Sequence, residues 1–155
     1  MADSMSSGAA TRGSMSRFNS IRRLSSVSRS DGSASATVTV DNLSPGNATW
    51  GAVTPGDAQV VLNWTNPGDA DFAEVVVLRH TASISDVPVE GASYVQGNTI
   101  GASTVRYAGS LQTFTDTGLV NATDYWYRIF ARDSRGNYAA TGAQTGPHTP
   151  SGGTT

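Results

Sequence analysis

Residues 113–131, TFTDTGLVNATDYWYRIFA, decide the fold of this chain. Their pattern predicts a short strand over 113–117, a corner, and an aromatic strand over 123–133. Successive side chains of a strand point to opposite faces, so the aromatic strand has two faces of different character. One face is apolar and is predicted to lie in the core: Tyr125, Tyr127, Ile129 and Ala131. The other carries arginines and is expected to be at least partly exposed: Trp126, Arg128, Phe130 and Arg132.

Further short strands are predicted on both sides of this stretch. Turn-forming clusters at 42–47, 54–57, 66–69 and 133–137 separate strands expected at 36–40, 48–53, 59–64, 74–80, 104–108 and 138–145. Trp64 and Leu119 are expected to pack against the aromatic face, and residues 75–78 are apolar on both faces, which is typical of a central strand. Residues 81–103 are predicted to form a long loop with one short strand. Such closely spaced strands favour an all-β sandwich of about seven strands.

The residue types argue against an enzyme. The chain of 155 residues has no cysteine, which excludes a disulfide framework, a thiolate nucleophile and a Cys-ligated zinc site. Its two histidines, His80 and His148, stand in no pattern with a nucleophile, so no catalytic residue and no cofactor is expected. Asp69 and Asp71 with Asp116 or Asp133 would bind calcium if their loops met. They lack EF-hand spacing, so turn capping is the favoured interpretation and no metal site is expected.

Residues 1–35 form a basic arm ahead of an acidic body. Residues 1–30 hold five arginines against one aspartate, a net charge of +4, and residues 31–155 hold five arginines against eleven acids, a net charge of −6. Serine, glycine and arginine dominate the arm, so it is expected to be disordered unless it binds a partner. Apolar residues recur in it at every third position from Met15 to Val27, among arginines. The candidate partner-binding residues are Arg12, Arg17, Phe18, Ile21, Arg22, Arg23, Leu24 and Arg29.

Two other interpretations of the arm remain open: a solvated leader with accidental spacing, and a nucleic-acid tail, for which five arginines and one aromatic residue are weak support. Residues 36–46 are predicted to form an extra strand and a linker. The strand over 36–40 is expected either at an edge of the sandwich or paired with a neighbouring subunit. A sandwich over 47–148 and a flexible tail over 149–155 complete the expected organisation.

From about residue 47 to 148 the chain resembles a fibronectin type III domain, in the form common in bacterial surface and secreted proteins. The matching features are Trp64 followed by Pro67, and the run Leu119-x-x-x-Thr123-x-Tyr125 with its alternation through Ala131. The resemblance implies a tyrosine corner, in which the Tyr125 hydroxyl bonds to upstream backbone. It also implies a scaffold for spacing, adhesion or protein interaction, without catalysis. Arg135-Gly136-Asn137 lacks the carboxylate of the family's Arg-Gly-Asp adhesion motif, so a turn is expected there.

These observations favour a non-enzymatic structural protein whose sandwich is held by its arm to a multi-subunit assembly. A virion decoration or accessory coat protein, or a surface filament subunit, fits this description, with a location on a virion or at the cell exterior. No signal peptide is recognisable, and no apolar run approaches the roughly 18 residues of a transmembrane helix. The alternative is an adhesive or carbohydrate-binding module of a secreted bacterial system. Trp126, Arg128, Phe130 and Arg132 would then form a surface strip for a glycan or protein, unless the neighbouring 94–107 region covers them.

Overall fold

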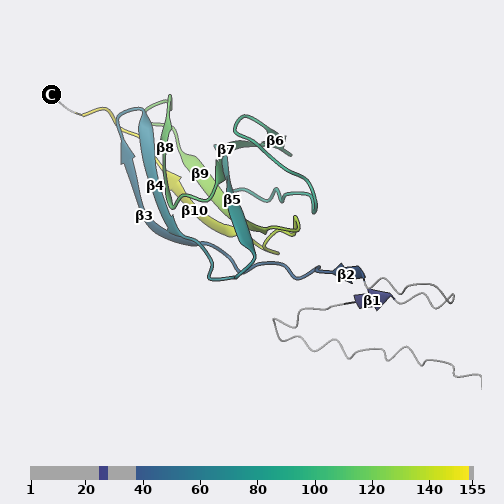
Figure 1. Cartoon of the computed structure of the whole chain (residues 1–155). Helices are drawn as coiled ribbons and strands as arrows, with labels where there is room; N and C mark the ends of the chain where they lie inside the picture. The colour runs from purple at the N-terminus through teal and green to yellow at the C-terminus, as the bar shows by residue number, and fades with distance from the viewer. Residues whose placement is uncertain (1–24, 28–37, 154–155) are drawn as a thin grey trace, which may run out of the picture.

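A computed structural model describes residues 25–27 and 38–153 of the chain (Figure 1). The described residues form strands and loops, with no helix. The strands are β1 (Ser25–Val27), β2 (Val38–Val40), β3 (Thr49–Gly56), β4 (Gln59–Thr65), β5 (Phe72–His80), β6 (Thr99–Ile100), β7 (Ser103–Gly109), β8 (Thr113–Thr117), β9 (Tyr125–Asp133) and β10 (Ala143–His148). The all-β prediction is therefore confirmed.

Eight of these strands build a sandwich of two antiparallel sheets (Figure 1). The smaller sheet has the order β3-β4-β8, and the larger has the order β10-β9-β5-β7-β6. The two-residue β6 is the short strand that was expected within the long 81–103 region. As predicted, β5 is central, because it pairs with β9 on one side and with β7 on the other.

The space between the sheets holds the main core. Alternation in β4 turns Val60, Leu62 and Trp64 inward, and alternation in β9 does the same for its apolar face. The predicted core residues are all buried there: Trp64, Leu119, Tyr125, Tyr127, Ile129 and Ala131. Trp64 lies at the centre of the aromatic packing, with ring centroids 6.1 Å from Trp50 and 5.5 Å from Tyr107. Aromatic pairs at such distances add to the stabilisation that burial alone provides.

A second core lies on the opposite face of the larger sheet. It contains Val76 and Leu78 of β5, Val105 of β7 and Phe130 of β9, packed with Ile100 of β6 and with Ile84 and Tyr138 from the loops. This core explains why residues 75–78 are buried without interruption. One face of β5 meets the smaller sheet, and the other meets the long loop between β5 and β6.

Two predicted boundaries are wrong. The last strand was expected over 138–145, but β10 is Ala143–His148, and Tyr138 forms only an isolated bridge with Arg132. Tyr138 is instead buried beneath the long loop, where its hydroxyl donates to the Ala92 carbonyl oxygen at 2.8 Å. The break expected at 54–57 is also displaced, because β3 continues to Gly56 and the chain turns at Asp57 and Ala58.

The two ends of the sandwich receive different parts of the chain. Residues 41–47 run along the end where β5 begins, whereas the segment after β10 lies at the end where β5 finishes. That last segment, expected to be a flexible tail, is tied down at its start: Pro150 is buried, and the Ser151 amide donates to the Gly56 carbonyl oxygen at 3.1 Å.

Candidate functional site

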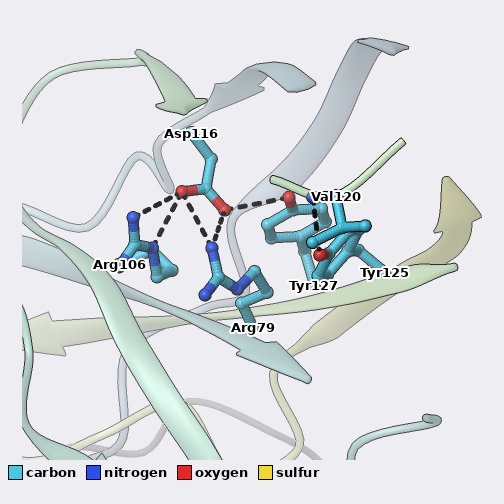
Figure 2. A network of polar contacts seen from close by, with 6 residues as sticks. All are labelled: Arg79, Arg106, Asp116, Val120, Tyr125 and Tyr127. Carbon is cyan, nitrogen blue, oxygen red and sulfur yellow. Dashed lines mark hydrogen bonds and ion pairs between the residues drawn. The ribbon is translucent and has the colours of Figure 1, made fainter. Parts of the chain in front are cut away.

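A buried aspartate joins the two sheets near one edge of the sandwich (Figure 2). Asp116 lies on β8 of the smaller sheet, and its side chain is fully buried. Arg79 of β5 donates to both of its carboxylate oxygens, at 3.0 and 3.2 Å. Arg106 of β7 donates to Oδ1 through Nε at 2.8 Å and pairs with it through Nη2 at 2.7 Å. The Tyr127 hydroxyl of β9 donates to Oδ2 at 3.0 Å.

Strand alternation places Asp116 between the sheets, and an irregularity in strand pairing does the same for Arg106. In β8, Thr113, Thr115 and Thr117 are exposed, so the alternate positions Phe114 and Asp116 point between the sheets. A register shift in the β5–β7 pairing leaves Arg106 without a partner across the ladder, since Tyr107 pairs with Val77 and Val105 with Leu78.

The electrostatics of this cluster fit a structural role. We call Asp116 and its three donors, Arg79, Arg106 and Tyr127, the clasp. A buried carboxylate is tolerated when its lone pairs are filled by charged and polar donors, and Asp116 has three such donor residues. Burial, followed by the neighbouring Asp116 charge and hydrogen bond, raises the pKa of Tyr127 far above its usual value, so the phenol stays protonated. The Arg79 and Arg106 side chains are only 22% and 20% exposed. With its donors in place, Asp116 presents no free oxygen for acid–base chemistry.

Sequence reasoning missed this clasp. Asp116 was considered only as a candidate calcium ligand or turn cap, and Arg79 and Arg106 were not singled out. The available signal was the inward position of an acid in an alternating strand. An inward carboxylate requires a cationic partner on another strand.

Tyr125 is the first residue of β9, where the strand leaves the corner at 118–124. Its hydroxyl accepts a hydrogen bond from the Val120 amide at 3.1 Å, which is the upstream backbone contact that the resemblance implies. The Arg79 guanidinium lies 5.4 Å from the centre of the Tyr125 ring, so the corner and the clasp share one residue.

The expected surface strip on the outer face of β9 is not an exposed strip. Phe130 is completely buried, because Ile84, Ile100 and Tyr138 cover it, whereas the arginines of this face are partly exposed, as expected. Trp126 is half-buried against the same cluster, which also takes in Tyr94. The 94–107 region contributes Tyr94, Ile100 and Val105 to this cover, and Ile84 and Tyr138 from outside that region complete it.

The two arginines of this face hold the covering segments in place. Arg128 lies over the Phe130 ring and donates to the Ile84 carbonyl oxygen at 2.9 Å and to the Thr141 carbonyl oxygen. Arg132 pairs with Glu74 at 3.0 Å and donates to the Ser93 hydroxyl at 3.0 Å. Both side chains are engaged within the domain.

Other candidates for chemistry have structural partners. His80 Nδ1 accepts from the Ala82 amide, and His148 Nε2 lies 2.9 Å from the Thr145 hydroxyl. Asp133 caps the turn at Arg135-Gly136-Asn137 by accepting from the amides of Arg135 and Asn137, each at 2.8 Å. Over the described residues, no group of three or more His, Asp or Glu side chains is arranged to hold a metal ion. Nor does that part of the chain contain a helix that would cross a membrane.

The linker between β2 and β3 is fixed to one end of the sandwich. The Asn137 side chain donates to the Asp41 carbonyl oxygen at 3.1 Å, and Asp69 accepts from the Gly46 amide at 2.8 Å. The Asn47 side chain donates to the Thr141 hydroxyl at 3.1 Å. Residues 41–47 therefore bind the loops that precede β5 and follow β9.

Beyond the linker, β2 pairs with β1 of the arm, a partner that neither sequence alternative for residues 36–40 had included. The candidate arm residues lie outside the described residues: Arg12, Arg17, Phe18, Ile21, Arg22, Arg23, Leu24 and Arg29.

No protein-family model and no curated protein sequence matches the chain. Its fold is similar to solved structures at low identity. A crystal structure of titin domains matches with a TM-score of 0.50 and 16% identity over 76% of this chain, which spans 36% of the length of the titin fragment. Domains d3–d4 of the rat CD45 extracellular region match with a TM-score of 0.51 and 12% identity, covering 90% of this chain and 71% of that one.

The fibronectin type-III domain of human fibronectin type III domain containing protein 3 is also similar. It has a TM-score of 0.45 and 17% identity over 81% of this chain and 94% of the human domain. At such identities the likenesses concern the fold alone. The two antiparallel sheets and the tyrosine corner have the form of a fibronectin type III-like sandwich.

Proposed function

We propose that this fibronectin type III-like sandwich is a non-enzymatic interaction module, anchored to a larger assembly by its N-terminal arm. The proposed setting is a virion, with the chain as a decoration or accessory coat protein, or a surface filament in which the chain is a subunit. The partner of the arm is protein. The described residues favour this function because their buried charges and aromatic side chains are committed to holding the fold.

One observation carries the proposal: the linker is attached to one end of the sandwich and the C-terminal segment to the other. Asn137 and Asp69 hold residues 41–47 where β5 begins, whereas Ala122 donates to the Pro150 carbonyl oxygen at the far end. A linker with fixed contacts sets the direction in which the arm leaves. A sandwich held in this way would extend outward from the surface to which its arm is bound.

The composition of the arm supports a protein partner. Its arginines alternate with Phe18, Ile21 and Leu24, so it would dock through apolar contacts supplemented by ion pairs. Segments of this kind order when they bind, and they bury apolar area that they cannot bury alone. A nucleic-acid tail would depend mainly on charge and on stacking aromatics, of which the arm has one, Phe18.

The carbohydrate-binding alternative has lost its main support. It required an open aromatic strip on β9, but Phe130 is buried and Arg128 and Arg132 bind neighbouring segments.

Deletion of the arm tests the proposal. The full chain and a chain lacking residues 1–35 are each tagged at the C-terminus and expressed in the native host, and the share of each that sediments with particles is measured. We expect the full chain in the particle fraction and the shortened chain in the soluble fraction. A third chain with the arm residues in shuffled order is the matched control, and it should also remain soluble. Equal incorporation of full and shortened chains would overturn the proposal.

A further inference from the structure

The loop between β5 and β6 presents apolar side chains to solvent. Among the described residues, five large hydrophobic side chains are more than half exposed, and three of them lie in this loop: Val87, Val89 and Val95. Val87 is 52% and Val89 is 65% exposed, and the intervening Pro88 is buried. The segment 86–90 therefore turns its two valines outward together. We call residues 86–90 the valine strip.

The valine strip is held firmly against the sandwich. The Val89 amide donates to the Tyr94 hydroxyl at 3.1 Å, and Glu90 accepts from the Tyr138 amide at 2.9 Å. The next residue, Gly91, donates to the Gly136 carbonyl oxygen at 3.0 Å. Asp86, at the other end, accepts from the Ser103 hydroxyl at 2.7 Å. Exposure of the two valines is thus part of an ordered surface, which offers an apolar partner fixed points of contact.

The charges around the strip match those of the arm. Asp86 and Glu90 flank the valines, and residues 81–98 contain no arginine. The end of the sandwich that continues from Glu90 is acidic as well, because Arg132 and Arg135 are outnumbered there by Asp41, Asp69, Asp71, Glu74, Glu90 and Asp133. An apolar strip with acidic flanks is complementary to an arm of apolar residues and arginines.

The chain path brings the arm to this end. The Asn137 side chain binds the backbone at Asp41, and the adjacent Gly136 binds Gly91 beside the strip. β1 and β2 pair antiparallel, with Ser25 opposite Val40. The chain that precedes Ser25 therefore leaves this small sheet at the end from which β2 continues to Asp41. Seven extended residues span up to roughly 24 Å, which is the reach of residues 18–24 from Ser25.

We propose that residues 17–24 of the same chain cover the valine strip in the isolated protein. Phe18, Ile21 and Leu24 pack on Val87 and Val89, while Arg17, Arg22 and Arg23 meet the acidic flanks. This contact goes beyond the anchoring function, since it concerns the chain before it meets any partner. It keeps the arm from binding elsewhere until a partner surface competes for it.

The absence of cysteine allows a direct test on the full chain. Ser20→Cys introduces a single thiol for a nitroxide spin label, and the backbone amide signals of the ¹⁵N-labelled protein are recorded with the label oxidised and reduced. We expect selective loss of the signals of Val87, Val89, Glu90 and Gly136 at low salt. The signals should return at about 1 M salt, where the Debye length falls to ~3 Å.

A mixing experiment identifies which chain supplies the arm. Spin-labelled chain without ¹⁵N is added to ¹⁵N-labelled chain without spin label. Signal loss at the strip in this mixture would show that a neighbouring copy is the occupant and would overturn the proposal. So would uniform or absent loss in the first experiment.

Charge variants separate docking from misfolding. The arm variant combines three substitutions outside the sandwich: Arg17→Gln, Arg22→Gln and Arg23→Gln. It should abolish the selective signal loss at the strip without changing other signals. Glu90→Gln and Asp69→Asn keep an acceptor oxygen and should weaken the loss. Asp57→Asn removes a charge at the opposite end and should leave it unchanged. An equal signal loss in the arm variant and the unmodified arm would contradict the proposal, whatever the outcome of the deletion test for anchoring.

Discussion

Tyr127 and Asp116 meet across the two sheets, with the phenol hydroxyl 3.0 Å from carboxylate Oδ2. Tyr127 belongs to the aromatic strand β9, and Asp116 belongs to the edge strand β8 of the smaller sheet. Through Asp116 the same contact extends to Arg79 and Arg106. One buried carboxylate therefore links β8 to three strands of the larger sheet.

Removing that charge should destabilise the domain strongly. Asp116→Asn keeps the shape of the side chain but leaves two guanidiniums without their carboxylate. Breaking a buried ion pair by removing one partner costs ~3–5 kcal/mol. We expect a loss at the low end of this range, because each arginine is about a fifth exposed. Urea unfolding measures it, with Asp57→Asn as an exposed control whose effect should be within ~0.5 kcal/mol. Equal effects of the two variants would show that the clasp does not stabilise the fold.

The tyrosine corner should have a smaller but measurable effect. Tyr125→Phe removes the hydroxyl that accepts from the Val120 amide, while the ring and its contact with Arg79 remain. The expected loss in unfolding free energy is about 1 kcal/mol. Tyr107→Phe is the matched control, because its hydroxyl accepts from the exposed Leu111 amide, which water can satisfy. A larger effect at Tyr107 than at Tyr125 would contradict this assignment.

Phe130 provides a test of the second core. Because it is fully buried under the long loop, Phe130→Ala should cost ~3–5 kcal/mol of unfolding free energy. Leu111→Ala removes an apolar side chain that is 63% exposed and should cost less than ~0.5 kcal/mol. Thermal unfolding of the two variants distinguishes a buried Phe130 from an exposed one, since an exposed phenylalanine would resemble the Leu111 control.

His148 should make stability depend on pH. Burial lowers the pKa of His148 in the folded state, so the unfolded state, with a pKa near 6.5, takes up a proton first as pH falls. The contribution of His148 to stability is complete above that value and declines below it. Compared with His148→Gln, the unmodified chain should lose more unfolding free energy between pH 7 and pH 5. Parallel stability curves for the two proteins would rule out this contribution.

The regular part of the fold was predictable because strand alternation is a local property. Val60, Leu62 and Trp64 are buried on β4, and Tyr125, Tyr127 and Ile129 on β9, as their spacing requires. The start of the last strand, β10, was harder to locate from the sequence. The turn at Gly142 has φ +60°, and a side chain there would collide with Phe130, so β10 begins after it.

The parts that were not predictable depend on contacts between distant segments. Whether Phe130 is exposed is decided by the loop that carries Ile84, which nothing in the sequence of β9 reveals. Similarly, which arginine reaches Asp116 depends on how the two sheets are stacked and on the irregular pairing that turns Arg106 inward. Fold class was therefore readable from local pattern, whereas the clasp and the covered face required the tertiary structure.

If residues 1–46, the arm and its linker, direct the chain to its assembly, they should do so when transferred to another protein. Residues 1–46 are fused to an unrelated monomeric fluorescent protein, and the share of fluorescence that sediments with particles is measured in the native host. We expect the fusion to enter the particle fraction, and the same fusion with Arg17, Arg22 and Arg23 changed to glutamine to stay soluble. A fusion that stays soluble while the full chain is incorporated beside it would show that the arm does not anchor the chain.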